Sequence, residues 1–254
     1  MKTEEYGKYF SLVYDSLNSD IDYNAWADFC EKCFEKYCGQ KVEHICEIAC
    51  GSGTMSVELE KRGYRLTSSD LSEQMLSVAD NKAQNSGCKN VVFTKQNMCS
   101  FTTASKAQAV ICLLDSINCL VKSKQIKDCF TCANKVLSDG GIFLFDVNSK
   151  IKFEKIYSDN AYVLENNGVL CAWQNEYNEK SKICNFYLSF FMENKDGLYE
   201  RYDEFVREKM YTQKALCKYL DQCGFNVMGV FSNFEFEKAD ENKDERLYFV
   251  AVKK

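Results

Sequence analysis

Strands and helices alternate along the middle of the chain, and this alternation restricts the fold more than any other feature of the sequence. Short apolar stretches with strand patterning are separated by stretches in which apolar residues recur at helical spacing. Strands joined by helices are parallel, and apolar runs such as AVICLL and GIFLF suit strands covered on both faces. The predicted strands are 42–49, 65–70, 91–96, 109–114 and 142–147, with helices at about 55–62, after Ser72 and at 126–137, and with a turn at SDGG.

Both ends of the chain add elements to this predicted sheet. Residues 1–40 have the apolar spacing of two helices, and Asp22 is a suitable N-cap for the second. Beyond residue 148 the period changes to two, as in CNFYLSFFM, so residues 162–211 are predicted to form antiparallel strands. The last predicted elements are a helix at 212–223 and strands at 226–231 and 247–252, with the charged segment EKADENKDER as a solvated loop before the final strand.

These elements predict an α/β fold with a Rossmann-like, seven-stranded mixed sheet, helices on both faces, and an N-terminal helical segment. We expect a main domain made of residues 1–149 and 212–254. A small antiparallel β cap, residues 150–211, is expected as an insertion after the fifth strand. A chain of 254 residues is long enough for such a domain and for a large core.

Composition and charge exclude several classes of partner. The chain is 46% hydrophobic and 27% charged, as soluble domains are, and its formal net charge is −5. An acidic chain is a poor general binder of phosphate backbones, so we expect no nucleic-acid partner. The N-terminus lacks the apolar core of a signal peptide, and no apolar run approaches the roughly 20 residues that span a bilayer. We therefore expect a cytoplasmic location and no membrane partner.

Fifteen cysteines raise the question of a metal site. Two Cys-x-x-Cys pairs, at Cys30 and Cys129, have a spacing that zinc sites use. Neither pair is followed by a glycine turn, and the single histidine, His44, lies inside a predicted strand. We therefore predict that the cysteines are mostly small buried apolar residues, that no metal is bound, and that His44 is structural.

The segment EIACGSGT, residues 47–54, predicts a nucleotide-binding turn between a strand and a helix. NAD and S-adenosylmethionine are both bound at such turns, and both need an acidic residue at the end of the next strand for the ribose hydroxyls. Asp70, 19 residues after Gly51, supplies that carboxylate for either ligand. The dinucleotide fingerprint needs a third glycine where this chain has Ser56. Glu47 suits an ammonium group better than a pyrophosphate, so S-adenosylmethionine is favoured over NAD.

The segment EIACGSGTMSVELEKRGYRLTSSDLSEQML resembles the first two motifs of class I S-adenosylmethionine-dependent methyltransferases. FTKQNM and AVICLLDSIN are similar to the segments after the third and fourth strands of that family. The resemblance covers nearly the whole chain and is closest to small stand-alone methyltransferases of Gram-positive bacteria. It implies a transferase of class EC 2.1.1.- with S-adenosyl-L-methionine as cofactor.

The resemblance also implies roles for individual residues. Small residues at Ala49, Gly51 and Gly53 would let the backbone approach the cofactor, and Asp70 would accept both ribose hydroxyls. Asn97 stands where many relatives carry an aspartate that binds the adenine amino group; the alternative is an asparagine that caps a loop. The complete predicted cofactor set is Tyr14, Glu47, Ala49, Gly51, Gly53, Asp70, Leu71, Met75, Asn97, Met98 and Leu113, with the carbonyl groups of Leu113 and Leu114 toward the methionine part.

Polar residues after the fourth strand are the candidates for contact with the methyl acceptor. The resemblance implies that Asp115, Ser116 and Asn118 point toward the methyl group that is transferred. The alternative is that they form a plain polar turn. Asp115 and Asn118 are the predicted substrate-orienting residues. The cap could add Trp173, Tyr199 or Arg201. Because the only histidine is elsewhere, no acid–base pair can be named, and an amine, which needs no strong base, is favoured as the acceptor.

Missing motifs narrow the substrate further. The chain has no proline, so it lacks the Asn/Asp-Pro-Pro-aromatic and Pro-Cys motifs of enzymes that methylate nucleic-acid bases. The arginine that clamps the carboxylate in glycine N-methyltransferases corresponds to Asn148, and a histidine frequent in related small enzymes corresponds to Val206. We predict methyl transfer to a small molecule, with nitrogen favoured as the atom that accepts the methyl group. The alternatives are a protein that binds S-adenosylmethionine without catalysis and an NAD-dependent oxidoreductase. We expect the protein to be a monomer or a homodimer.

Overall fold

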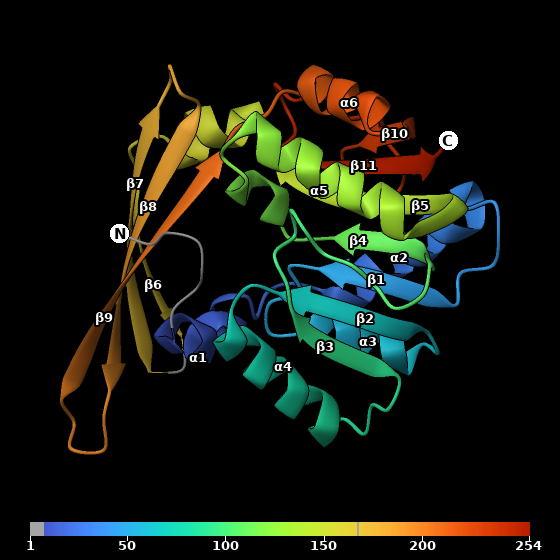
Figure 1. The fold of residues 1–254 in the computed structure, drawn as a ribbon. Coiled ribbons are helices and arrows are strands. Elements are labelled where there is room, and N and C mark those ends of the chain that lie inside the picture. Colours follow the sequence, from blue (N-terminus) through green and yellow to red (C-terminus); the bar gives the residue numbers. More distant parts are fainter. Residues whose placement is uncertain (1–7, 167) are drawn as a thin grey trace.

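The predicted seven-stranded mixed sheet is confirmed in a computed structural model, which describes residues 8–166 and 168–254 (Figure 1). The strand order is β10-β11-β5-β4-β1-β2-β3. β1 to β5 run parallel, whereas β11 is antiparallel to both of its neighbours, β5 and β10. The strands are β1 (His44–Ile48), β2 (Arg65–Asp70), β3 (Val91–Lys95), β4 (Ala107–Cys112), β5 (Leu137–Asn148), β10 (Phe225–Phe231) and β11 (Arg246–Lys253).

Helices cover both faces of this sheet, as predicted, because the strands are apolar on both sides. In β5, Phe143 and Phe145 face the core beneath α5, whereas Ile142 and Leu144 face the core beneath α2. Among the described residues, no helix is long and apolar enough to cross a membrane. The helices are α1 (Lys8–Leu17), α2 (Tyr23–Tyr37), α3 (Thr54–Lys61), α4 (Glu73–Asn85), α5 (Ser123–Val136) and α6 (Gln213–Gln222).

A second, four-stranded antiparallel sheet stands beside the carboxyl ends of β1 and β4, where Figure 1 shows their arrowheads. This cap contains β6 (Ala161–Asn166), β7 (Val169–Asn178), β8 (Ile183–Glu193) and β9 (Tyr199–Lys209). The predicted shared face of β8 is confirmed, because Phe186, Leu188 and Phe190 are all buried. That face packs against α1 and against a π-helical turn, η2 (Lys152–Tyr157). The exact boundaries of the cap at residues 150 and 211 stay a prediction.

The helical segment predicted for residues 1–40 contains α1 and α2, and residues 1–7 lie outside the described part. Asp22 caps α2, because its carboxylate accepts the backbone N–H of Ala25 at 3.0 Å. One predicted turn is wrong. SDGG forms part of β5, which already pairs at Leu137 with Ala107. The register then shifts, and Gly140 adopts a positive φ of 72°, so the segment is an irregular strand instead of a turn.

None of the fifteen cysteines forms a disulfide bond. Cys30 and Cys129 are buried as predicted, whereas Cys132 is only half-buried. Within residues 8–166 and 168–254, no group of three or more histidine, cysteine, aspartate or glutamate side chains is arranged to hold a metal ion. His44 has structural partners, since Nδ1 lies 3.1 Å from the Lys106 carbonyl oxygen and Nε2 lies 2.8 Å from the Thr67 hydroxyl.

Candidate active site

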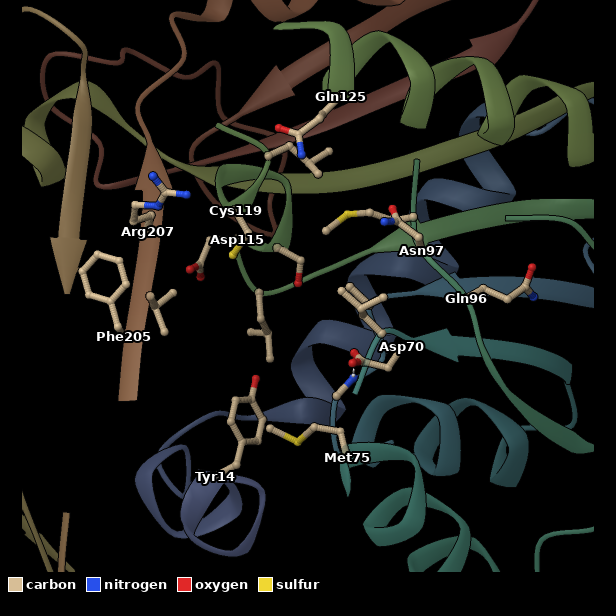
Figure 2. A pocket seen from close by; sticks show the side chains of 18 residues that line it. Tyr14, Asp70, Met75, Gln96, Asn97, Asp115, Cys119, Gln125, Phe205 and Arg207 are labelled. Atoms are coloured by element: carbon tan, nitrogen blue, oxygen red, sulfur yellow. Dashed lines mark hydrogen bonds between the residues drawn. The ribbon is translucent and has the colours of Figure 1, made fainter. Parts of the chain in front are cut away.

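A pocket of about 1160 Å³, counting the solvent at its mouth, lies at the carboxyl ends of β1, β2 and β4 (Figure 2). Its walls come from the sheet edge with the loops that follow it, from α1, from the first turns of α4 and α5, and from β9 of the cap. Carboxyl ends of parallel strands are where α/β folds bind ligands. The lining residues are Tyr14, Ala49, Gly51, Asp70, Leu71, Met75, Gln96, Asn97, Met98, Leu114, Asp115, Ser116, Cys119, Leu120, Gln125, Phe205, Val206 and Arg207.

The chain turns sharply where β1 and β4 reach the pocket. Ala49 has φ 54°, Leu114 has φ 56° and Asp115 has φ 53°, all in the left-handed region that side chains other than glycine disfavour. Each such residue costs on the order of 1–2 kcal/mol. Three of them along one pocket indicate backbone conformations that the fold maintains at a functional site. At Gly51, φ is 53°, and a Cβ atom there would lie 3.7 Å from the Tyr14 ring, beside the pocket.

Asp70 organises the glycine turn from the end of β2. Its Oδ2 accepts the backbone N–H of Gly51 at 2.9 Å, and its Oδ1 accepts the backbone N–H of Ser72 at 2.9 Å. The carboxylate is 7% exposed and still lies on the pocket wall. Carboxylate oxygens have further lone pairs, so Asp70 can hold the turn and also accept hydroxyl groups of a ligand.

Glu47 lies behind the turn in a buried polar group and does not line the pocket. The Ser56 hydroxyl donates to its carboxyl group, and the Ser68 hydroxyl lies 2.8 Å from that of Ser56. Burial raises the pKa of Glu47 to about 7, although the bond from Ser56 opposes the shift. Its predicted contact with a ligand ammonium therefore stays a prediction. Ser56, where a dinucleotide fold would have glycine, is used to hold this carboxyl group.

The raised pKa of Glu47 predicts a pH-dependent stability. A carboxyl group whose pKa is higher in the folded than in the unfolded state stabilises the fold below about pH 4.5 and loses this effect as pH rises through 7. Relative to Glu47→Gln, the wild-type protein should lose about 3 kcal/mol of unfolding free energy between pH 4.5 and 8. Urea denaturation at both pH values measures this, and a pH-independent difference would show that Glu47 titrates normally.

Gly53 does not line the pocket, and its predicted cofactor contact stays untested. It is the N-cap of α3 with φ 72°, and a Cβ atom there would lie 2.7 Å from that of Ala79 in α4. No real Cβ contact is so short, so the glycine lets α3 and α4 approach each other behind the turn.

Gly53→Ala should therefore lower the free energy of unfolding by about 2–4 kcal/mol, the sum of left-handed strain and overpacking. Gly63→Ala is the matched control, because Gly63 also has a positive φ but nothing lies within 4 Å of its Cβ position. Urea denaturation compares the two variants. Equal losses would mean that the contact with Ala79 does not require glycine.

Tyr14 extends its hydroxyl from α1 into the pocket (Figure 2). Burial, followed by the nearby Tyr23, Asp115 and Asp70, raises the pKa of Tyr14 well above its ordinary value, so the hydroxyl stays protonated. The next residue, Asp15, anchors the helix: it forms an ion pair with Lys82 of α4 at 2.7 Å and accepts the Ser52 hydroxyl at 2.5 Å. This anchor places Tyr14 over the glycine turn.

The opposite end of the pocket has apolar walls around polar loop groups. Leu71 and Met98, both predicted cofactor positions, line this end, whereas Met75, another predicted position, lies beside Tyr14 (Figure 2). Asn97 caps its loop, because its Oδ1 accepts the backbone N–H of Cys99 at 2.8 Å. This was the alternative to adenine binding, but the two are compatible, since Asn97 also lies on the pocket wall and its amide NH₂ group can donate.

Asp115 lies on the pocket wall and forms an ion pair with Arg246, a residue predicted to lie in a solvated loop. Arg246, at the end of EKADENKDER, forms an ion pair with Asp115 at 2.8 Å and another with Asp146, which is fully buried. Burial opposes the charge on Arg246, but Asp146 and Asp115 raise the pKa of its guanidinium above the ordinary value. The solvated-loop prediction is therefore wrong at Arg246, whose side chain is 21% exposed.

Asn118 joins the sheet to the cap and does not line the pocket. Its Nδ2 donates to the Lys209 carbonyl oxygen at 2.8 Å, and its Oδ1 accepts the backbone N–H of Asn148 at 2.9 Å. Asn148 Nδ2 in turn lies within hydrogen-bond distance of the Tyr157 hydroxyl and of Glu208. Burial and the charge of Asp115 raise the pKa of Glu208 well above its usual value. The geometry gives Asn118 a connecting position, and contact with a substrate stays a prediction.

The lining contains eleven of the predicted site residues and several that the sequence did not indicate. The predicted residues on the wall are Tyr14, Ala49, Gly51, Asp70, Leu71, Met75, Asn97, Met98, Leu114, Asp115 and Ser116, whereas Glu47, Gly53, Leu113 and Asn118 do not line the pocket. None of Trp173, Tyr199 and Arg201 lines it; the cap contributes Phe205, Val206 and Arg207 instead. The other unpredicted lining residues are Gln96, Cys119, Leu120 and Gln125.

Comparison with known proteins identifies the family. Residues 45–141 match a family model described as a methyltransferase domain. A protein from Geobacillus sp. (strain WCH70), named as a methyltransferase by inference, is 31% identical to this chain over 244 residues. The matched residues are 96% of this chain and 98% of that protein. The crystal structure of an S-adenosylmethionine-dependent methyltransferase from Clostridium acetobutylicum has a TM-score of 0.85, with 28% identity over 96% of this chain and 97% of that one. The chain belongs to the S-adenosylmethionine-dependent methyltransferases.

A more distant methyltransferase, described as a sugar N-methyltransferase from Streptoalloteichus sp., shares the fold with a TM-score of 0.76 at 15% identity, covering 100% of this chain and 96% of that one. The cofactor of the family is S-adenosylmethionine, and the pocket fits it. Gly51 leaves room for a nucleoside against the backbone, and Asp70 presents a carboxylate where ribose hydroxyls need an acceptor. Membership of this family rules out the alternative prediction of an NAD-dependent oxidoreductase.

Proposed function

We propose that this methyltransferase methylates the nitrogen of a small-molecule amine. The observation that carries the proposal is Asp115, a carboxylate on the pocket wall at the end of β4, held at 2.8 Å by Arg246. A carboxylate in that position can accept an N–H of the acceptor and aim its lone pair. The sole histidine, His44, is bonded within the sheet and is absent from the lining, which disfavours acceptors that need a strong base.

The reaction needs few groups from the protein. When bound, S-adenosylmethionine supplies a methyl group on a positively charged sulfur. An amine nitrogen would form its bond to that methyl carbon as the carbon–sulfur bond breaks, and the sulfur would keep the electron pair. Asp115 orients the amine in line, and the walls formed by α1 and β9 exclude water. The proton lost from the methylated ammonium passes to Asp115 or to solvent.

The acidic net charge and the absence of proline-containing motifs support a small acceptor instead of a nucleic acid. The sugar N-methyltransferase from Streptoalloteichus sp. shares the fold, and its nitrogen acceptor is compatible with an amine acceptor here.

The test is the time-dependent formation of S-adenosylhomocysteine from S-adenosylmethionine with a panel of small amines, matched alcohols and short RNA. We expect turnover with one or more amines and none with the alcohols or RNA. Binding of S-adenosylmethionine in calorimetry without turnover on any acceptor would instead indicate a protein that binds the cofactor and does not transfer methyl. Mass spectrometry of small molecules that co-purify with the protein gives an independent route to the acceptor.

A further inference from the structure

The cap sheet has two faces, and one of them packs against the rest of the chain. Phe186, Leu188 and Phe190 of β8 lie on this inner face, in apolar clusters with residues of α1 and η2. Because side chains alternate along a strand, Tyr187 and Phe191 lie on the opposite face. Strand pairing adds four further residues to this outer face: Val163, Glu165, Leu170 and Arg201. Figure 1 shows α1 and the main sheet on one side of the cap and no described helix or strand on the other.

The outer face carries apolar side chains that water reaches. Val163 of β6 is 70% exposed and Tyr187 is 45% exposed, whereas Leu170 and Phe191 are half-buried. Strand pairing places them side by side, since Leu170 is paired with Phe191, and Val163 with Ala172. An apolar patch that no described element covers is typical of a site that binds another macromolecule.

The outer face has the dimensions of one side of a protein interface. β7, β8 and β9 have 10, 11 and 11 residues, and β6 has 6. Strands at a spacing of about 4.8 Å, with a rise of about 3.4 Å per residue, then cover roughly 600 Å², and the relief of the side chains adds to this area. A specific interface of standard size buries about 800 Å² on each partner.

One row of residues across the four strands has opposite charges at its two ends. Glu165 of β6 is paired with Leu170 of β7, and Leu170 is paired with Phe191 of β8. Phe191 is paired with Arg201 of β9, whose guanidinium carbon lies 5.9 Å from the centre of the Phe191 ring. Arg201 also forms an ion pair with Asp203, but both side chains are more than half exposed, so the guanidinium can accept a second carboxylate. The row therefore reads acid, apolar, apolar, base.

A second copy of this chain is complementary to such a row. If the copy is turned by 180° about an axis parallel to the strands, its β9 lies over β6 and its β8 lies over β7. Arg201 of each copy then faces Glu165 of the other, and Phe191 of each faces Leu170 of the other. Two-fold symmetry forms every such contact twice, which is how most homodimers are built.

We infer that the outer face of the cap is a homodimer interface, in which two cap sheets pack face to face. Sheets that pack in this way lie about 10 Å apart and bury the apolar residues of both facing surfaces. The pocket stays outside this interface, because Val206, which lines it, is paired with Phe186 and lies on the inner face.

The first test is the mass of the protein in solution. Light scattering after size exclusion, and sedimentation over a range of micromolar concentrations, should give twice the mass of one chain. Phe191→Asp should raise the dissociation constant of the dimer at least about tenfold, because it buries a charge without a partner. Met228→Asp is the matched control, since Met228 is an apolar residue of the main sheet that is 46% exposed, and this variant should stay dimeric.

Exchange of the two charges tests the arrangement of the copies. Arg201→Glu and Glu165→Arg should each weaken the dimer at least about tenfold, because like charges then face each other at two places. A mixture of these two variants should dimerise at least about tenfold more tightly than either alone, because both contacts are then between opposite charges.

The affinity for S-adenosylhomocysteine, measured by calorimetry, should be unchanged in all four variants and so shows that each is folded. A wild-type chain that stays monomeric throughout, or a dimer that Phe191→Asp leaves intact, would overturn the inference. A mixture of the charge variants that dimerises no better than its components would overturn the face-to-face arrangement. None of these measurements needs a methyl acceptor, so their result is independent of the proposed N-methyltransferase function.

Discussion

Arg246→Met should lower the free energy of unfolding by about 3–5 kcal/mol, because it leaves a buried carboxylate without its counter-charge. Asp146 is fully buried, its Oδ1 has no hydrogen-bond partner in the described structure, and its Oδ2 depends on Arg246 and on the backbone N–H of Asp115. Burial already raises the pKa of Asp146, and the guanidinium is the main group that opposes this. Chemical denaturation at pH 7 measures the loss.

Two controls make this result specific to the buried pair. Arg201→Met breaks an exposed pair with Asp203 and should cost about 1 kcal/mol or less. The double variant Arg246→Met/Asp146→Asn should recover part of the stability, since the unpaired charge is gone. The loss in Arg246→Met should also shrink as pH falls, because Asp146 becomes protonated in the folded state. A loss no larger than that of Arg201→Met would contradict the assigned role.

Asp70→Ala should weaken cofactor binding by at least about 1.5 kcal/mol, or more than tenfold, because charge-assisted hydrogen bonds are lost. The variant also removes the acceptor for the N–H groups of Gly51 and Ser72, so the turn itself loosens. Calorimetric titration with S-adenosylhomocysteine measures the change. Glu73→Ala is the matched control, since Glu73 is the next acidic residue, is exposed and does not line the pocket. Unchanged affinity in Asp70→Ala would remove the ribose role from this residue.

The sheet and the cofactor side of the pocket could be predicted from the sequence because their signals are local. Apolar runs mark β1, β4 and β5, and the glycine turn with Asp70 indicates a ligand site at one edge of the sheet, where the pocket lies. The predicted bounds are close where a capping residue marks the start of a helix, as Asp22 does for α2 and Ser72 does for α4. The turn predicted at SDGG is wrong because pairing of β5 with β4 outweighs the strong local turn signal.

The acceptor side could not be predicted in the same way, because its residues meet through contacts between distant parts of the chain. Arg246 and Asp146 are 100 positions apart, and the charged segment before Arg246 is indistinguishable from a solvated loop. Arg207 reaches the pocket only through the register of β9 on β8. From the sequence, Ser56 is notable only because the dinucleotide fingerprint has glycine at that position. In the fold its hydroxyl donates a hydrogen bond to the buried Glu47.

The attachment of α1 has a consequence for the rate at which products leave. Tyr14 covers the glycine turn, and the ion pair between Asp15 and Lys82 joins its helix to α4, beside the apolar cluster that contains Phe10 and Met75. Both side chains of this pair are partly exposed, so dissolved ions weaken it. We therefore expect a nucleoside to leave past Tyr14 faster at high ionic strength, so that an enzyme limited by this step should turn over faster in concentrated salt.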